Sequence, residues 1–388
     1  MPDTNSPISD KELERRWTIA RQIMADHGLD ALVMQAREDW IGGYVRWFTD
    51  VPANNGYPRT VVFFADRPMV VIEMGAFGTD RRPQAGNKST RGVGQVLGTP
   101  SFHSIHYTIR YDTELLLGCL QGCKRVGALA PAAMPYSMTA ALMTQFDLFD
   151  VTEALDAAKA IKSPEEIALI HQCAALQDQV FAEVCDFIRP GVSDRDITSF
   201  AEAVGRRLGS DQGIHLGLSA PMGSASRFAP RHFQTRELRA GDHMSLLIEV
   251  SGPGGLYLEI ARTMVLGTAD DHLLGAFEQV KAAQDHTLSL MHPGAAPAQI
   301  SAAHDAWMRA RGLPPETRLY AHGQGYEMVE RPLIRHDETM PLAEGMCLAV
   351  HPGFDDGRVF AVICDNYMIE AEGPSACLHR TEKKIFEL

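Results

Sequence analysis

The sequence lacks any apolar run long enough for a transmembrane helix, which needs about 20 consecutive apolar residues. It also lacks a stripe of Lys and Arg, since its formal net charge is −13 and the acidic residues are spread along the chain. These two absences argue against a membrane and against nucleic acid as partners. Hydrophobic residues make up 45% of the chain and charged residues 22%, which is the balance of a soluble globular protein.

Cysteine is scarce and shows no pairing pattern. The chain has 7 cysteines, an odd number, which favours reduced thiols. Cys119 and Cys123 lie four residues apart with no second pair at zinc-binding spacing, so the sequence predicts no structural zinc there. Residues 1–5 are polar and lack the apolar segment of a secretory signal. We therefore expect a cytoplasmic protein.

The length of 388 residues is sufficient for two domains. Short apolar strands at residues 31–34, 59–64 and 69–73 alternate with helical stretches, which predicts a small α/β domain over residues 1–155. Ser163, Pro164 and Glu166 together form a strong helix start, followed by a long helix to residue 188. We expect a second domain over residues 156–388, with further helices at residues 194–208, 271–290 and 297–311.

Acidic and imidazole side chains recur in or beside the apolar strands of the C-terminal half. An isolated charge in an apolar strand is costly unless it is paired or coordinated. Several such residues in one half of the chain predict a polar cluster at the mouth of a sheet, and hence an enzyme's site. The residues are Glu249, Glu259, His322, His351 and Asp365.

The segments around these residues resemble the creatinase/Xaa-Pro aminopeptidase family, whose catalytic domain has the "pita-bread" fold. The resemblance runs from about residue 161 to the end, in ordered blocks at residues 161–167, 190–194, 241–263, 322–325, 344–353 and 365. It implies an α+β protein in which a smaller α/β domain like the creatinase N-terminal domain precedes the pita-bread catalytic domain. It also implies a homodimer, and it identifies the five residues above with the positions of the family's metal ligands.

The ligand types depart from the family pattern. Metal-dependent members use Asp, Asp, His, Glu and Glu at these positions, so all but His322 have changed type here. Peptidase members carry a second histidine seven residues after the first, where this chain has Val329. This substitution argues against peptide hydrolysis.

Every changed position still carries a residue that can ligate a metal. Two imidazoles with carboxylates suit one divalent ion such as Zn, Fe, Mn or Ni. A two-metal site is disfavoured, because His351 replaces a carboxylate that could bridge two ions. The alternative is a metal-free site of the creatinase type, in which the same side chains bind the substrate directly. A merely structural polar cluster is a third interpretation.

The resemblance also suggests residues that act on the substrate. His232 lies where the family carries a catalytic histidine, and imidazole is suited to proton transfer near neutral pH. Tyr257 and Glu330 are expected to bind the substrate. Alternation along a strand would turn Cys364 away from the face of Asp365, and we expect it to serve packing.

Two arginines complete the expected site. Residues 44–50 are rich in aromatics and look like a loop, from which Arg46 would grip a substrate carboxylate, across a dimer in creatinase-like members. A surface stack of arginine on aromatics is the alternative. Arg262 follows Glu259 closely and is expected to orient its carboxylate.

The expected function is hydrolysis of a C–N bond in a small non-peptide molecule by a creatinase-like, non-peptidase member of the family. One alternative is a metal-dependent lyase like the enzyme that cleaves dimethylsulfoniopropionate. A second alternative is a Xaa-Pro dipeptidase or aminopeptidase, and a third is a non-catalytic binding module. The retention of a titratable residue at all five positions counts against the binding module.

Overall fold

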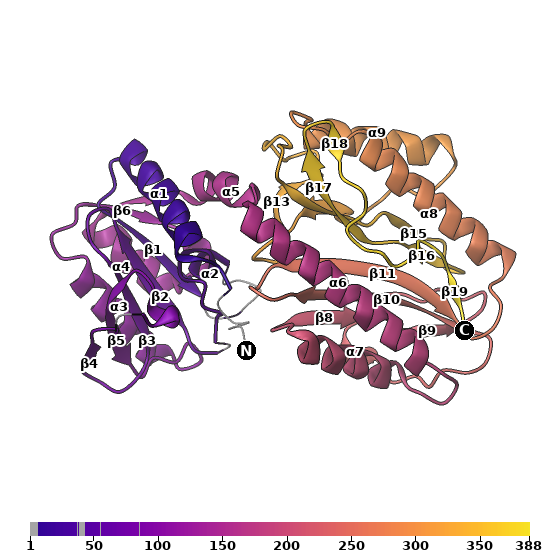
Figure 1. The fold of residues 1–388 in the computed structure, drawn as a ribbon, viewed down its shortest axis with the longest axis horizontal. Helices are drawn as coiled ribbons and strands as arrows, with labels where there is room; N and C mark the ends of the chain where they lie inside the picture. The colour runs from indigo at the N-terminus through magenta and orange to yellow at the C-terminus, as the bar shows by residue number, and fades with distance from the viewer. Residues whose placement is uncertain (1–6, 37, 39–42, 55, 85) are drawn as a thin grey trace. The chain divides into compact units, whose positions relative to one another are not determined.

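The computed structural model describes residues 7–36, 38, 43–54, 56–84 and 86–388. The chain divides into two compact units, Met1–Lys159 and Ala160–Leu388 (Figure 1). Residues 1–5, whose polarity motivated the expected cytoplasmic location, lie outside the described residues. Within the described part of the chain, no helix combines the length and apolar character that crossing a bilayer requires.

The first unit is built on one mixed sheet. Its strands lie in the order β4-β5-β3-β2-β1-β6-β7, with β1 antiparallel to β2 and parallel to β6. The strands are β1 (Ala31–Ala36), β2 (Arg59–Phe64), β3 (Met69–Met74), β4 (Thr79–Arg81), β5 (Val93–Thr99), β6 (Arg125–Ala128) and β7 (Asp147–Asp150). The helices are α1 (Asp10–His27), α2 (Gly43–Thr49), α3 (Ile109–Cys119), α4 (Tyr136–Gln145) and α5 (Thr152–Ala160), with short 3₁₀ turns at Lys88–Thr90, His106–Thr108 and Pro131–Ala133.

The expectation of a loop at residues 44–50 is wrong, because this segment forms α2. Its aromatic residues Trp47 and Phe48 are buried, and α1 holds them through hydrogen bonds to their carbonyl oxygens. The side chain of Arg46 is also buried, with its Nε 3.7 Å from Oδ1 of Asp50. The aromatics therefore belong to the core of the first unit rather than to an exposed substrate-gripping loop.

The second unit contains the four long helices α6 (Pro164–Phe187), α7 (Asp194–Leu208), α8 (Asp271–Ser289) and α9 (Pro297–Ala310), and a 3₁₀ turn at Arg231–Phe233. The predicted helix start at Ser163 is confirmed, since its hydroxyl accepts from the N–H of Glu166 and the Glu166 carboxylate accepts from the N–H of Ser163. Helices α6 and α7 pack on the sheet that contains β10 (Asp242–Ser251) and β11 (Tyr257–Val265) through a shared apolar core (Figure 1).

Two main sheets position the site. The first has the order β19-β11-β10-β8, with β9 also paired to β10. The second has the order β13-β12-β14-β17-β18, and an isolated bridge between Ala261 and Cys364 links the two sheets. The remaining strands are β8 (Gly213–Leu216), β9 (Ser219–Pro221), β12 (Ala321–Gly323), β13 (Glu330–Leu333), β14 (Cys347–Val350), β15 (Gly353–Asp355), β16 (Phe360–Val362), β17 (Asp365–Glu370), β18 (Gly373–Pro374) and β19 (Phe386–Glu387). An α+β architecture, as the sequence predicts, is confirmed.

Candidate metal centre

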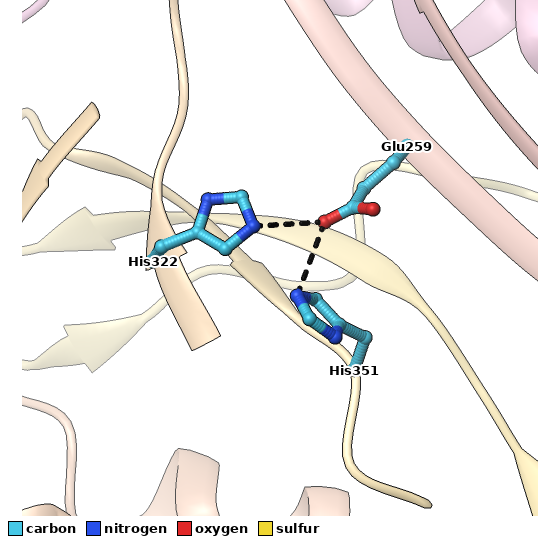
Figure 2. Close-up of side chains that lie close together, drawn as sticks. All are labelled: Glu259, His322 and His351. Carbon is cyan, nitrogen blue, oxygen red and sulfur yellow. Dashed lines mark ion pairs between the residues drawn. The ribbon is translucent and has the colours of Figure 1, made fainter. Parts of the chain in front are cut away.

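The centre of the site is a group of one carboxylate and two imidazoles. Oε1 of Glu259 on β11 lies 3.4 Å from Nε2 of His322 on β12 and 3.5 Å from Nε2 of His351, which follows β14 (Figure 2). The ligand atoms of the three residues all lie within 4.8 Å of one another. Because β12 pairs with both β13 and β14, one sheet presents both histidines to the carboxylate from the other sheet.

Nε2 of His322, one of the two nitrogen atoms that face Glu259, carries a free lone pair. Nδ1 of His322 lies 2.9 Å from the carbonyl oxygen of Gly323, so Nδ1 carries the proton and Nε2 is the lone-pair atom. Within the described residues, neither Nε2 of His351 nor Oε1 of Glu259 makes a hydrogen bond, although both are buried. Acceptor atoms that converge without a proton between them are costly unless a cation lies among them.

Glu249 and Glu259 form an adjacent buried carboxyl pair, opposite each other in the β10–β11 register. Burial and the neighbouring charge of Glu259 raise the pKa of Glu249 well above its usual range. Burial also opposes ionisation of Glu259, but His351 and His322 outweigh it and lower the pKa of Glu259 to about 2. In the metal-free protein these opposite shifts favour a proton on Glu249 rather than on Glu259. Burial lowers the pKa of His351 to about 4, which keeps its imidazole neutral and able to ligate.

Two amide side chains that the sequence analysis did not single out connect these groups. Nε2 of Gln324 donates to Oε1 of Glu249 at 3.0 Å, and its Oε1 accepts from Nδ2 of Asn366 at 2.8 Å. Oδ1 of Asn366 accepts from the backbone N–H of Glu259 at 2.8 Å. Each amide thus has one defined orientation. Their positions in the sequence could have identified them, because Gln324 directly follows His322-Gly323 and Asn366 directly follows Asp365.

Asp365 does not join the group of three. Its Oδ1 accepts from Nη2 of Arg262 at 2.7 Å and lies 3.5 Å from Nδ1 of His379, while its Oδ2 accepts from Nε2 of Gln284 at 3.3 Å. Burial works against ionisation, but the Arg262 guanidinium and His379 hold the pKa of Asp365 far below its usual range. Asp365 instead belongs to a second group of ligand-capable side chains with Cys377 and His379.

Arg262 differs from its expected role for the same reason. Its guanidinium donates to Asp365 and to the carbonyl oxygens of Ala261 and Cys364, so it orients Asp365 rather than Glu259. Successive residues of a strand point to opposite faces, which places Arg262 on the side away from Glu259 and Ala261.

The other predicted site residues lie in different surroundings. His232 is exposed in a 3₁₀ turn, and its ring contacts Phe233 with a centroid distance of 4.0 Å. Glu330 forms a buried ion pair with Lys162 at 2.8 Å. Tyr257 is buried, and its backbone N–H donates to the carbonyl oxygen of Gly325 at 2.6 Å, next to the histidine turn. Arg46 belongs to the first unit, paired with Asp50.

Comparison with known proteins agrees with this geometry. Residues 168–371 match the model of metallopeptidase family M24. The probable dipeptidase PepE of Mycobacterium tuberculosis is 27% identical over 226 residues, which cover 57% of this chain and 59% of that protein. The Xaa-Pro dipeptidase of Pyrococcus horikoshii is 23% identical over 281 residues, or 69% of this chain and 76% of that protein.

Solved structures show the same architecture over nearly the whole chain. The X-Pro aminopeptidase of Thermotoga maritima has a TM-score of 0.79 at 15% identity and covers 96% of this chain and 99% of its own. The dipeptidase PepE of Mycobacterium ulcerans has a TM-score of 0.75 at 19% identity, with 98% of each chain covered. The family match spans more than half of the chain and includes the three converging ligands. The chain belongs to metallopeptidase family M24.

Proposed function

We propose that this protein is a hydrolase that cleaves the C–N bond of a small amide, with one divalent metal ion held by Glu259, His322 and His351. The observation that carries the proposal is the convergence of the ligand atoms of these three residues within 4.8 Å, with Oε1 of Glu259 and Nε2 of His351 lacking a hydrogen bond in the described structure. Two imidazoles and a carboxylate are a common set for a catalytic ion of the zinc type.

When bound, such an ion polarises a carbonyl oxygen and acidifies a water molecule. The protein's own groups would complete the chemistry. Glu249 lies opposite Glu259, and Gln324 fixes the Glu249 carboxyl by donating to its Oε1. Asn366 in turn fixes Gln324 and the backbone of Glu259, so the carboxyl pair is held in one arrangement.

A dipeptide with a C-terminal proline is the first substrate to test. The named relatives are dipeptidases and Xaa-Pro dipeptidases, which supports a peptide substrate over the non-peptide molecule that the sequence analysis favoured. These two relatives are 27% and 23% identical to this chain, which matches 59% of the length of PepE.

A non-peptide amide is the second candidate. Val329 stands at the position where the resemblance places a second histidine in peptidase members. Valine has no imidazole, so this position cannot bind a peptide substrate as that histidine would. His351 in place of a carboxylate also favours a single ion over the two-metal arrangement.

The test combines metal analysis with hydrolysis assays. The purified full chain would be assayed against Xaa-Pro dipeptides, matched Xaa-Ala dipeptides and small non-peptide amides with added Zn, Mn, Fe or Co. We expect about one equivalent of metal per chain and hydrolysis of a C–N bond. His322→Ala should abolish this hydrolysis. The control variant His336→Ala, which changes an exposed histidine, should hydrolyse the substrate as the native protein does. If the purified protein contains no metal and His322→Ala still hydrolyses the substrate, the metal mechanism is wrong. The metal-free, creatinase-like site would then be the mechanism to test. Hydrolysis of amides but not dipeptides would select the second candidate.

A further inference from the structure

A buried thiol lies beside the carboxylate of the proposed metal centre. Cys364 is fully buried, and its Sγ lies 3.6 Å from the carbonyl oxygen of Glu259. Burial and the nearby carboxylates of Glu259, Asp365 and Glu249 raise the pKa of the Cys364 thiol well above its usual range, so the thiol keeps its proton unless a cation is bound. Cys364 packs with Leu247 and Ala261, the strand residues two positions from Glu249 and Glu259. The thiol therefore faces the same side of the sheet as the carboxyl pair.

The backbone of Cys364 is held firmly in this position. Its carbonyl oxygen accepts from the N–H of Ala261 at 3.2 Å and from Nη1 of Arg262 at 3.0 Å. Its own N–H donates to the carbonyl oxygen of Ala261 at 3.4 Å. The next residue, Asp365, is fixed on the opposite side by Arg262. The strand cannot turn to exchange the two side chains without breaking this buried ion pair.

The three converging residues leave a divalent ion one protein ligand short of four. Oε1 of Glu259 is buried and makes no hydrogen bond within the described residues. This unpaired oxygen indicates a bound cation, and the indication does not depend on the cysteine. We propose that Cys364 is a further ligand of the ion, as a thiolate. This inference rests on the proposed metal centre and extends it to a donor set of one carboxylate, two imidazoles and one sulfur.

The coordination step is a simple exchange. As the bond between sulfur and metal forms, the S–H bond breaks and its proton passes to solvent, with no change of oxidation state. The thiol donates to the carbonyl oxygen of Glu259 and lies outside the group of three, so ligation requires its side chain to rotate about the Cα–Cβ bond and give up that contact. A thiolate ligand shifts metal preference towards Zn and Co and away from Mn and Mg.

Cobalt substitution tests the proposal without relying on activity. The full chain would be loaded with Co²⁺ and its absorption spectrum recorded, because a thiolate ligand adds a charge-transfer band in the near ultraviolet. Visible ligand-field bands report cobalt in the site whether or not sulfur is bound. The variants are Cys364→Ala and the matched control Cys347→Ala, another fully buried cysteine that lies on β14.

We expect native protein and Cys347→Ala to show both sets of bands, and Cys364→Ala to lose the charge-transfer band while keeping the visible bands. The affinity of Cys364→Ala for Zn²⁺ should fall at least about tenfold. Visible bands without a charge-transfer band in the native protein would overturn the proposal and leave the three-residue centre intact. Absence of both sets of bands from the native protein would overturn the metal centre itself. A charge-transfer band that Cys377→Ala removes, and that Cys364→Ala leaves in place, would assign the sulfur to the second group and also overturn the proposal. If Cys364→Ala fails to fold, Cys364→Ser takes its place in the comparison.

Discussion

Among single residues, Arg262 and Asp365 form a fully buried ion pair that joins β11 to β17. Removing one partner leaves an uncompensated buried charge, which costs about 3–5 kcal/mol. We therefore expect Asp365→Asn to lower the free energy of unfolding by that amount, measured by urea denaturation. As a control, Asp355→Asn removes a partly exposed pair with Arg227 and should cost about 1 kcal/mol or less.

The same variant tests the sequence prediction for Asp365. If Asp365 were a metal ligand, Asp365→Asn would lose bound metal while stability of the metal-free protein stayed near that of the native chain. If Asp365 acts through Arg262, as the contacts indicate, metal-free stability falls first. Measuring bound metal and metal-free stability in the same preparation therefore distinguishes a metal ligand from a residue that stabilises the fold through Arg262.

Gln324 offers a second residue-scale prediction. Gln324→Ala removes the hydrogen-bond partner of both Glu249 and Asn366 in a buried site. A buried polar group left without its partner costs about 1–3 kcal/mol, so we expect a loss of at least that size in a urea titration. The control is Gln22→Ala, which removes an exposed hydrogen bond to Asp26 and should change stability by about 0.5 kcal/mol or less. Equal small effects of the two variants would contradict the amide connection described above.

At the scale of secondary-structure elements, His304 couples α9 to α8. Its Nδ1 lies 2.9 Å from the hydroxyl of Thr287, and its ring stacks on Tyr320 at 4.1 Å. Burial lowers the pKa of His304 to about 4, whereas the unfolded value is about 6.5. The unfolded chain therefore binds this proton first as the pH falls, and stability decreases between pH 6.5 and 4 by up to about 3 kcal/mol.

The measurement is the free energy of unfolding across that pH range for native protein and His304→Asn. We expect the variant to be less stable at pH 7 and to show a shallower loss on acidification. His351 also has a lowered pKa, so the difference between the two curves is the relevant quantity. Parallel curves would show that protonation of His304 does not oppose the α8–α9 packing.

For the whole molecule, the proposed metal ion should stabilise the second unit. A ligand at 100 times its Kd stabilises the folded state by about 2.7 kcal/mol. All the proposed ligands lie in Ala160–Leu388. We expect added Zn²⁺ to slow hydrogen exchange in β11, β12 and β14 and to leave β1, β2 and β3 of the first unit unchanged, as measured by mass spectrometry of the full chain. Slowing confined to the first unit would place the ion elsewhere.

The homodimer and the cytoplasmic location are predictions of a different kind, since both come from the sequence and the family resemblance. Native mass spectrometry of the full chain would test the first directly. A monomer at micromolar concentration would remove the expectation that Arg46 acts across a dimer, an expectation already weakened by its burial beside Asp50.

Several features were decided by the sequence alone because they depend on neighbours in the chain. The helix start at Ser163 follows from local capping, and the helix over residues 194–208 and the strand over residues 59–64 follow from periodicity. The residues of the converging group could also be named in advance, because charged side chains in apolar strands are rare without a partner. The period of two along a strand also predicted that Cys364 and Asp365 oppose each other.

Which of these two side chains faces Glu259 was decided only by the tertiary structure. That choice depends on Arg262, more than 100 positions earlier in the chain, which binds Asp365 and fixes the strand. Likewise, Glu330 finds its partner in Lys162, 168 residues away. Alternation along a strand is a local property, whereas the face that meets a given charge is set by contacts between segments far apart in the chain. The sequence could therefore name the residues capable of metal chemistry, but only folding determined which of them meet.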